Sequence, residues 1–321
     1  MLPLRLRRLN PAPGPGSVCY LSAVQSALMI VTRHAGRKGT RRAAERAAVR
    51  MRDRGVDVRL ERTGSAEEAA ALIATTAPNV DAVVSVGGDG TVRGVVDALL
   101  ASGIEVDVGI IPRGTANVVA RELGVPIHPV RAADVVVDGT PRRIDVGKVN
   151  DETFLAMVGI GLDATIVQGV RPGRLKLARM GWSSMQTLAR PRFQPLRILV
   201  NGEEITEPSF SAVVTNTRNY AGWFSLCPAA APDDGRFDLI RTRRRDRRAI
   251  LRLVSAAVRW RPTSARVAAY SRGETFLIES TGAHQVPVQA DGDPCGTTPV
   301  RISIVKSAVA IIAPATNGAP S

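Results

Sequence analysis

The chain has 321 residues, a length that allows about two domains. With 45% hydrophobic and 22% charged residues, its composition is typical of a globular protein with a sizeable core. A formal net charge of +14 favours an anionic partner, but aromatic residues make up only 4% of the chain, which argues against nucleic-acid binding by base stacking. Three cysteines without CxxC spacing argue against a zinc site and a disulfide framework, and no apolar run approaches the ~18 residues that a membrane-spanning helix needs.

Residues 1–25 are rich in proline and glycine and predict a disordered leader. From there to residue 141, short apolar runs alternate with helical patterns, which predicts a parallel sheet covered by helices on both faces. Ser65 and Glu68 have the spacing of a capping box at the start of one helix. The expected strands are 28–31, 56–60, 82–86 and 108–111, and the expected helices are 40–54, 65–73, 91–100 and 130–137.

Two consecutive strand–turn–helix units at 81–124 organise this first half. The strands at 82–86 and 108–111 each lead into a glycine-containing turn, and each turn opens a helix. Glycines let a backbone approach a phosphate closely, while turn amides and the helix dipole point toward the anion. We therefore interpret the two turns as a nucleotide site.

A simpler interpretation is that Gly87, Gly88 and Gly90 only make a turn between a strand and a helix. Asp89 argues for a functional role, because a carboxylate beside a phosphate is unfavourable unless a metal ion or a hydroxyl substrate uses it. The repetition of a polar turn at 114–117, one unit later, points the same way.

The pattern changes near residue 142, where strands begin to dominate. A hairpin is expected around Asn150 and Asp151, and Asn201-Gly202 is a strong signal for another. We expect an antiparallel β-sandwich with one or two inserted helices, one of them within 175–188. The expected strands are 142–149, 153–159, 196–200, 210–215, 237–241, 266–270, 275–279, 286–289, 300–305 and 309–312.

The predicted fold class is thus α/β plus β, with an N-terminal parallel α/β nucleotide-binding domain and a C-terminal antiparallel β-sandwich. The expected division is a leader at 1–25, the α/β domain at 26–141, the β-sandwich at 142–313 and a tail at 314–321.

Two common nucleotide-binding motifs do not account for the chain. GIGLDA at 159–164 follows a strand and matches the dinucleotide-binding pattern, but no acidic residue occurs between Asp163 and Glu203 to bind a ribose. A Walker A motif is also absent, so a different loop must hold any nucleotide.

GGDGT at 87–91 and PRGTAN at 112–117 resemble the diacylglycerol kinase catalytic domain, a family of bacterial lipid kinases that includes sphingosine and ceramide kinases. IDVG at 144–147, GIGLDA at 159–164, DDGRFD at 233–238 and QADGDP at 289–294 extend the resemblance in the same order over roughly residues 28 to 313. The resemblance implies an α/β domain and a β-sandwich with the active site in the cleft between them.

The resemblance also implies roles for single residues. Asp293 would be the proton acceptor for the lipid hydroxyl, Asp291 its neighbour in the turn, and Asp163 would face the lipid headgroup. A structural magnesium ion would bind Asp234 and the backbone carbonyls of Ala231 and Arg236. The phosphates of ATP would lie against Val86, Gly87, Gly88, Asp89, Gly90, Thr91 and Val92, with Thr115, Asn117 and Gly36 contributing from two other turns.

The chain departs from the family pattern at four places. Residues 32–36 read TRHAG where the family has NPxSG, and Val118 stands where its GTxND turn has an acid. Leu60 falls where a nucleotide-contacting threonine is common, and Asp293 replaces glutamate, which retracts the expected base by one methylene.

A run of arginines between Arg241 and Arg252 fits an anionic membrane surface, where each cation contributes about 1 kcal/mol, and fits equally a solvated helix end. Arginine outnumbers lysine so heavily that genomic composition also explains part of the charge.

The leading hypothesis is an ATP- and Mg²⁺-dependent kinase that phosphorylates a hydroxyl of diacylglycerol or a related sphingoid or ceramide-like lipid. It would be cytoplasmic, bound peripherally to the anionic inner face of the membrane, with no nucleic-acid partner and with a homodimer as an open alternative. An NAD kinase, which shares GGDGT, and a catalytically weak nucleotide- or lipid-binding regulator remain alternatives.

Overall fold

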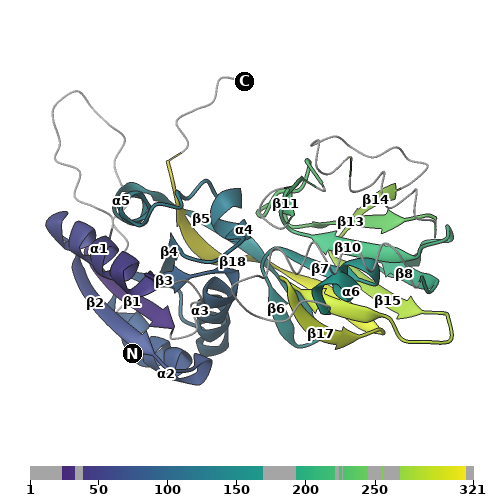
Figure 1. Ribbon diagram of the computed structural model, residues 1–321, viewed down its shortest axis with the longest axis horizontal. Helices are drawn as coiled ribbons and strands as arrows, with labels where there is room; N and C mark the ends of the chain where they lie inside the picture. Colours follow the sequence, from purple (N-terminus) through teal and green to yellow (C-terminus); the bar gives the residue numbers. More distant parts are fainter. Residues whose placement is uncertain are drawn as a thin grey trace, which may run out of the picture.

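The structure, a computed structural model, describes residues 24–32, 39–168, 193–220, 224–225, 227–244, 255 and 268–315, which form two lobes (Figure 1). Some sequence expectations lie outside these residues. They are the leader up to residue 23, Gly36 with its basic neighbours Arg37 and Lys38, the helical stretch at 175–188, the arginines at 245–252 and the tail from residue 316.

The N-terminal lobe is a parallel sheet with helices on both faces. Its elements are β1 (Ser26–Thr32), α1 (Thr40–Asp53), β2 (Asp57–Thr63), α2 (Ala66–Thr76), the 3-10 helix η1 (Ala77–Asn79), β3 (Ala82–Gly87), α3 (Asp89–Ser102), β4 (Asp107–Pro112), α4 (Val118–Glu122) and α5 (Pro129–Asp138). The strands are ordered β2-β1-β3-β4, and Figure 1 shows α1 and α5 on one side of them and α2 and α3 on the other. Met29, Val84 and Ile110 are fully buried in the resulting core, as expected for central parallel strands.

The C-terminal lobe is built mainly from antiparallel strands. Its elements are β5 (Thr140–Val149), β6 (Glu152–Phe154), β7 (Met157–Ile160), α6 (Leu162–Gln168), β8 (Leu196–Val200), β9 (Glu203–Glu204), β10 (Ser211–Thr215), β11 (Asn219–Tyr220), β12 (Phe224–Ser225), β13 (Phe237–Thr242), β14 (Ala268–Gly273), β15 (Thr275–Ser280), β16 (Pro287–Ala290), β17 (Asp293–Thr297) and β18 (Val300–Ala313). One sheet has the order β14-β13-β10-β7-β16-β17, and β18, β15, β8 and β9 continue the other sheet. The fold class predicted from the sequence is confirmed.

The last strand, β18, belongs to both lobes. It pairs with β15 near Ile302, with β5 along most of its length, and in parallel with β4 at Ile311 and Val108. Ile302 is buried in the core of the C-terminal lobe, whereas Ile311 is buried in that of the N-terminal lobe. The two strands expected at 300–305 and 309–312 are therefore one strand with a bulge between them, and the chain returns to the first lobe at its end.

The strand expected at 153–159 divides into β6 and β7, which pair in different sheets. The backbone amides of Leu155, Ala156 and Met157, where the strand divides, donate hydrogen bonds to the side chain of Asp291. A contact with a residue so far along the chain leaves no pattern in the local sequence, which is why the division was missed.

Two local expectations agree with the structure. Ser65 accepts a hydrogen bond from the amide of Glu68 at 3.2 Å, as a capping residue does. Asn201 and Gly202 both have positive φ between β8 and β9, as a tight hairpin requires. Across the described residues, no helix has both the length and the apolar character needed to cross a membrane.

Candidate active site

The two glycine turns meet backbone to backbone. β3 ends at Gly87, and the amide of Arg113 in the second turn donates to the Gly87 carbonyl at 2.6 Å. A Cβ atom added at Gly114 would lie 2.4 Å from Cα of Gly88, so neither glycine has room for a side chain. The turns predicted from local sequence are thus brought together, and their contact explains why both need glycine.

Asp89 points toward the second turn. Its Oδ1 accepts a hydrogen bond from the amide of Val119 at 3.1 Å, at the start of α4. Burial raises the pKa of Asp89, and hydrogen bonds from the amides of Val119 and Val118 partly oppose that rise. The carboxylate between the glycines therefore serves as a cap that joins the two turns.

The side chain of Asn117 closes the second turn. Its Oδ1 accepts from the amide of Gly114 at 2.7 Å and its Nδ2 donates to the carbonyl of the same residue at 3.1 Å. Asn117 has a φ of +48° and is buried, whereas Thr115 is exposed. Of these two expected nucleotide contacts, Asn117 shapes the turn and Thr115 presents its side chain to solvent.

The first turn offers mainly backbone to a ligand. Val86 and Val92 are buried in the lobe, so their side chains face the core. The amide of Thr91 donates to the Gly88 carbonyl at 2.9 Å, and its side chain packs so closely over Gly87 that a Cβ there would lie 2.2 Å from Oγ1. Gly90 is exposed with open space around it.

The turn between β16 and β17 carries Asp291 and Gly292, both with positive φ. Three backbone amides, those of Leu155, Ala156 and Met157, donate to the Asp291 carboxylate at 2.8 to 3.0 Å. Desolvation raises the pKa of Asp291, and the three amides oppose the rise. Asp291 thus fixes the turn to the connection between β6 and β7.

Asp293 follows in the same turn, with 56% of its side chain exposed. Nη2 of Arg93, on α3, donates to Oδ2 of Asp293 at 2.9 Å, and Nη1 donates to the carbonyl of Ala290 at 3.3 Å. The expected base is therefore joined directly to the helix that starts in the first glycine turn. Sequence reasoning missed Arg93, because its partner lies 200 residues away and no local pattern marks it.

Asp163 lies behind this turn at the start of α6 and is buried. Nε2 of Gln289 donates to its Oδ2 at 2.5 Å. Burial raises the pKa of Asp163 to about 6, and the bond from Gln289 partly offsets this. The expected headgroup contact therefore faces Gln289, the residue two positions before Asp291.

The sequence comparisons bear on both lobes. Residues 26–149 match the diacylglycerol kinase catalytic domain, and residues 156–313 match the YegS C-terminal NAD kinase beta sandwich-like domain. A diacylglycerol kinase of Mycobacterium tuberculosis is 34% identical over 283 residues, which cover 85% of this chain and 90% of that protein. The chain belongs to the diacylglycerol kinase family. The resemblance inferred from the sequence is confirmed, and the protein is a lipid kinase.

More distant members of the diacylglycerol kinase family agree. A diacylglycerol kinase of Bacillus subtilis is 28% identical over 224 residues, covering 68% of this chain and 73% of the relative. A crystal structure of a diacylglycerol kinase from Bacillus anthracis superposes with a TM-score of 0.72 at 21% identity, covering 91% of this chain and 98% of that one, which shows a shared fold.

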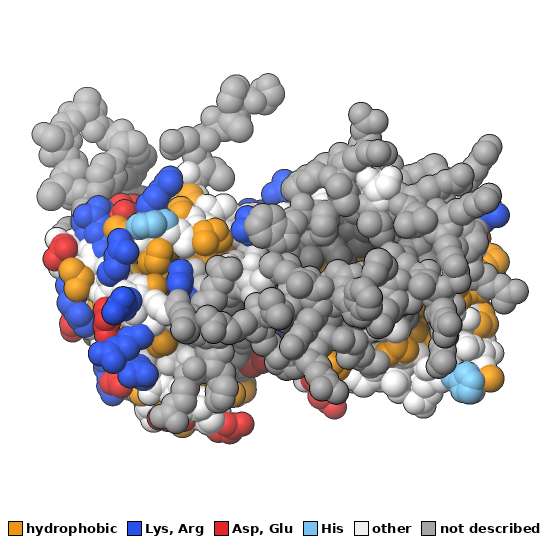
Figure 2. Space-filling model, viewed as in Figure 1, with side chains coloured by type: hydrophobic (Ala, Val, Ile, Leu, Met, Phe, Trp, Pro, Cys, Tyr) orange, Lys and Arg blue, Asp and Glu red, His pale blue; other side chains and the backbone are white. Residues whose placement is uncertain are grey.

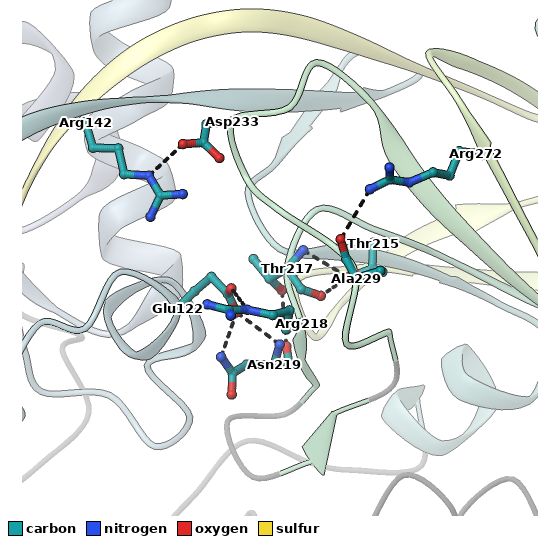
Figure 3. Close-up of polar contacts among 9 residues, drawn as sticks. All are labelled: Glu122, Arg142, Thr215, Thr217, Arg218, Asn219, Ala229, Asp233 and Arg272. Carbon is teal, nitrogen blue, oxygen red and sulfur yellow. Dashed lines mark hydrogen bonds and ion pairs between the residues drawn. The ribbon is translucent and has the colours of Figure 1, made fainter. Parts of the chain in front are cut away.

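The loop expected to hold a magnesium ion in this lipid kinase is paired with a cationic side chain, that of Arg272 on β14. Nη2 of Arg272 donates to Oδ2 of Asp234 at 2.7 Å. It also donates to the carbonyl of Ala229 at 3.2 Å (Figure 3). The amide of Arg236 donates to the other oxygen of Asp234 at 3.1 Å. Both oxygens of Asp234 are thus engaged within the protein, one of them by a guanidinium that also pairs with Asp238, and the magnesium site at Asp234, Ala231 and Arg236 stays a prediction. Across the described residues, no group of three or more His, Cys, Asp or Glu could hold a metal ion.

The same loop is tied to the rest of the lipid kinase by two further carboxylates. Asp233 pairs with Arg142 at 2.7 Å (Figure 3), and this hydrogen bond lowers the pKa of Asp233. The fully buried Asp145 accepts hydrogen bonds from the amides of Gly235 and Ser307, both at 2.7 Å. The DDGRFD segment is therefore held in place by its own ion pairs and by β5 and β18.

Glu122, at the end of α4, makes a second polar link between the lobes. Its carboxylate accepts from Nε of Arg218 at 2.8 Å and from the amide and Nδ2 of Asn219 at 3.1 and 2.6 Å (Figure 3). Only 1% of the Glu122 side chain is exposed. The second glycine turn is thus connected through α4 to β11 of the other lobe.

Of the arginines in the basic run that the structure describes, Arg241 and Arg243 are engaged within the protein, whereas Arg244 is exposed. Arg241 is buried within β13, and burial lowers its pKa. Arg241 and Arg243 both pair with Glu207. Figure 2 shows Lys and Arg side chains gathered on one face of the N-terminal lobe, with acidic side chains among them.

Proposed function

We propose that the protein transfers the γ-phosphate of ATP, in the presence of Mg²⁺, to a hydroxyl of diacylglycerol or a related sphingoid or ceramide-like lipid. The observation that supports this best is the 2.9 Å contact between Arg93 on α3 and Asp293, because it puts a carboxylate next to the helix of the glycine turn. Phosphoryl transfer needs a nucleotide and an activated hydroxyl at the same place, which this arrangement would provide.

In this proposal the backbone of residues 86–92 lies against the ATP phosphates, with Thr115 from the second turn and Gly36 from the first strand–helix connection. The contact between Gly88 and Gly114 makes one continuous backbone surface from the two turns. Mg²⁺ bound with ATP would neutralise phosphate charge during the reaction. Arg113, in the second turn, would add a cation to this surface.

Asp293 takes the role of general base. The lipid hydroxyl oxygen attacks the γ-phosphorus and forms a new P–O bond, while the bond to the β,γ-bridging oxygen breaks and ADP leaves with that electron pair. The hydroxyl proton passes to the carboxylate of Asp293. The exposure of more than half of that side chain leaves it open to a substrate.

A lipid substrate requires contact with a membrane surface, and we propose a peripheral one on the cytoplasmic side. The net charge of +14 supports an anionic surface, and the related proteins named diacylglycerol kinase support a glycerolipid acceptor. The arginines of α1 that the structure leaves exposed, among them Arg42 and Arg46, would contribute to this contact.

The experiment is phosphate transfer from labelled ATP with Mg²⁺ to mixed micelles of diacylglycerol, sphingosine or ceramide, with NAD as a parallel acceptor. We expect a labelled lipid that disappears in Asp293→Asn while ATP still binds. Asp57→Asn is the matched control, because it makes the same chemical change at an exposed site at the start of β2.

Other outcomes would replace the proposal. Labelled NADP in place of a lipid would identify an NAD kinase. ATP binding without any product would favour a regulatory protein, and turnover that survives Asp293→Asn would remove Asp293 from its role.

A further inference from the structure

We infer that Arg93 is a positioning residue that holds the base Asp293 in register with the glycine turn. The inference rests on the proposed function, because it assigns to Arg93 a role in the same phosphoryl transfer. It starts from the two contacts that one guanidinium makes across the lobes.

The contacts of Arg93 span the turn. Nη2 donates to the carboxylate of Asp293 at 2.9 Å, and Nη1 donates at 3.3 Å to the carbonyl of Ala290, the residue just before the turn. A planar guanidinium fixes two acceptors at once, which a lysine ammonium does less well. Arg93 is 21% exposed, so this pair is more shielded from solvent on the arginine side than a typical surface ion pair.

The other contacts of the turn hold its backbone but not the carboxylate of Asp293. Asp291 anchors the turn through three amides of the β6–β7 connection. Oε1 of Gln289 accepts from the amide of Gly292 at 2.7 Å. The side chain of Asp293, by contrast, is mostly exposed and is joined to Arg93, which therefore fixes the direction in which the base points.

Arg93 also relates the base to the nucleotide. It lies one helical turn after Asp89, whose carboxylate caps α4, so the first turn, the second turn and the base are coupled through α3.

The test is the steady-state kinetics of Arg93→Met and Arg93→Lys with the lipid that wild type phosphorylates best. A base that is misplaced by about 1 Å loses on the order of 100-fold in rate, so we expect kcat of Arg93→Met to fall about 10- to 100-fold. The KM for ATP should stay within about threefold, since Arg93 acts on the base, and Arg93→Lys should recover part of kcat.

Arg143→Met is the matched control. Arg143 also bridges a carboxylate and a carbonyl, donating to Glu105 at 3.1 Å and to the Ser307 carbonyl at 2.9 Å, but away from the turn. We expect its kcat to stay within about twofold of wild type, as for most surface substitutions.

Each result has one meaning. A wild-type protein without turnover on any lipid would overturn the proposed function. A wild-type protein with turnover and an Arg93→Met variant of unchanged kcat would overturn this inference alone. Equal losses in kcat and in thermal stability for Arg93→Met and Arg143→Met would also overturn it.

Discussion

Gln289 donates a hydrogen bond from Nε2 to the buried carboxylate of Asp163 at 2.5 Å. Through its Oε1, the same side chain accepts the amide of Gly292, between Asp291 and Asp293. Asp163, which the family resemblance assigns to the lipid headgroup, is therefore linked through Gln289 to the turn that carries the base Asp293.

The burial of Asp163 makes stability depend on pH in a predictable direction. Burial raises the pKa of Asp163 to about 6, above its unfolded value near 3.8. The folded state holds the proton more tightly, so the contribution to stability is fully present below about pH 4 and is lost as pH rises through about 6. In the Asp163→Asn variant, the free energy of unfolding should not show this decrease as the pH rises. Urea denaturation between pH 4 and 7 measures it.

Asp57→Asn is the control for that experiment, because Asp57 is exposed and should keep the wild-type dependence. Parallel pH curves for wild type and Asp163→Asn would contradict the assignment.

The Gln289→Leu variant should have a lower kcat than wild type. The substitution removes the hydrogen bond to Gly292 and leaves the Asp163 carboxylate without its amide donor.

Asp291 and Asp293 should separate stability from catalysis. Asp291→Asn leaves three inward-pointing amides facing a single acceptor oxygen and an amide group, so it should lower the free energy of unfolding by about 2 kcal/mol. Asp293→Asn breaks one exposed ion pair and should cost about 0 to 1 kcal/mol while abolishing transfer. Denaturant titration and kinetics of the two variants provide the comparison, and equal stability losses would contradict it.

Local sequence was enough to predict the features that depend on neighbours along the chain. The strands leading into Gly87 and Gly114, the cap at Ser65 and the hairpin at Asn201 follow from patterns a few residues long. The family motifs identified Asp291 and Asp293 as members of one turn, and the structure has both there.

Features that depend on distant partners were not predictable in this way. The division of 153–159 follows from Asp291, and the partnership of Arg93 with Asp293 joins residues 200 positions apart. Asp89 suggested a contact with a metal ion or a hydroxyl substrate, because its partner in the fold, the amide of Val119, is reached only when the two turns meet. A charged residue in a motif does not reveal which backbone amides the fold will place beside it.

The contact between the glycine turns predicts a specific sensitivity. In Gly114→Ala the new methyl group would lie 2.4 Å from Cα of Gly88 and 2.8 Å from Oδ1 of Asn117, so the turns must separate. We expect ATP affinity to fall at least about tenfold, because the joint backbone surface is lost. Calorimetric titration with ATP measures this.

Gly94→Ala is the matched control for the glycine variant. Gly94 lies on α3, and a Cβ there meets nothing within 4 Å. Replacing an exposed helical glycine should stabilise the protein by about 0.5 to 1 kcal/mol and leave ATP affinity unchanged. A Gly114→Ala variant with wild-type affinity would show that the turns need not touch to bind nucleotide.

Arg272 should make the loop at 229–238 independent of a bound metal ion. Its guanidinium binds Asp234 at 2.7 Å, Asp238 at 2.9 Å and the carbonyl of Ala229, which gathers two carboxylates around one fixed cation. We therefore expect a chelator to leave amide hydrogen exchange of this loop unchanged in the nucleotide-free protein. In Arg272→Met, exchange should accelerate because the two carboxylates repel one another, and added Mg²⁺ should restore part of the protection.

Arg142→Met is the control, because it frees only Asp233. It should show a smaller effect without recovery by Mg²⁺. Faster exchange of the wild-type loop after chelation would instead support the magnesium site expected at Asp234 from the sequence.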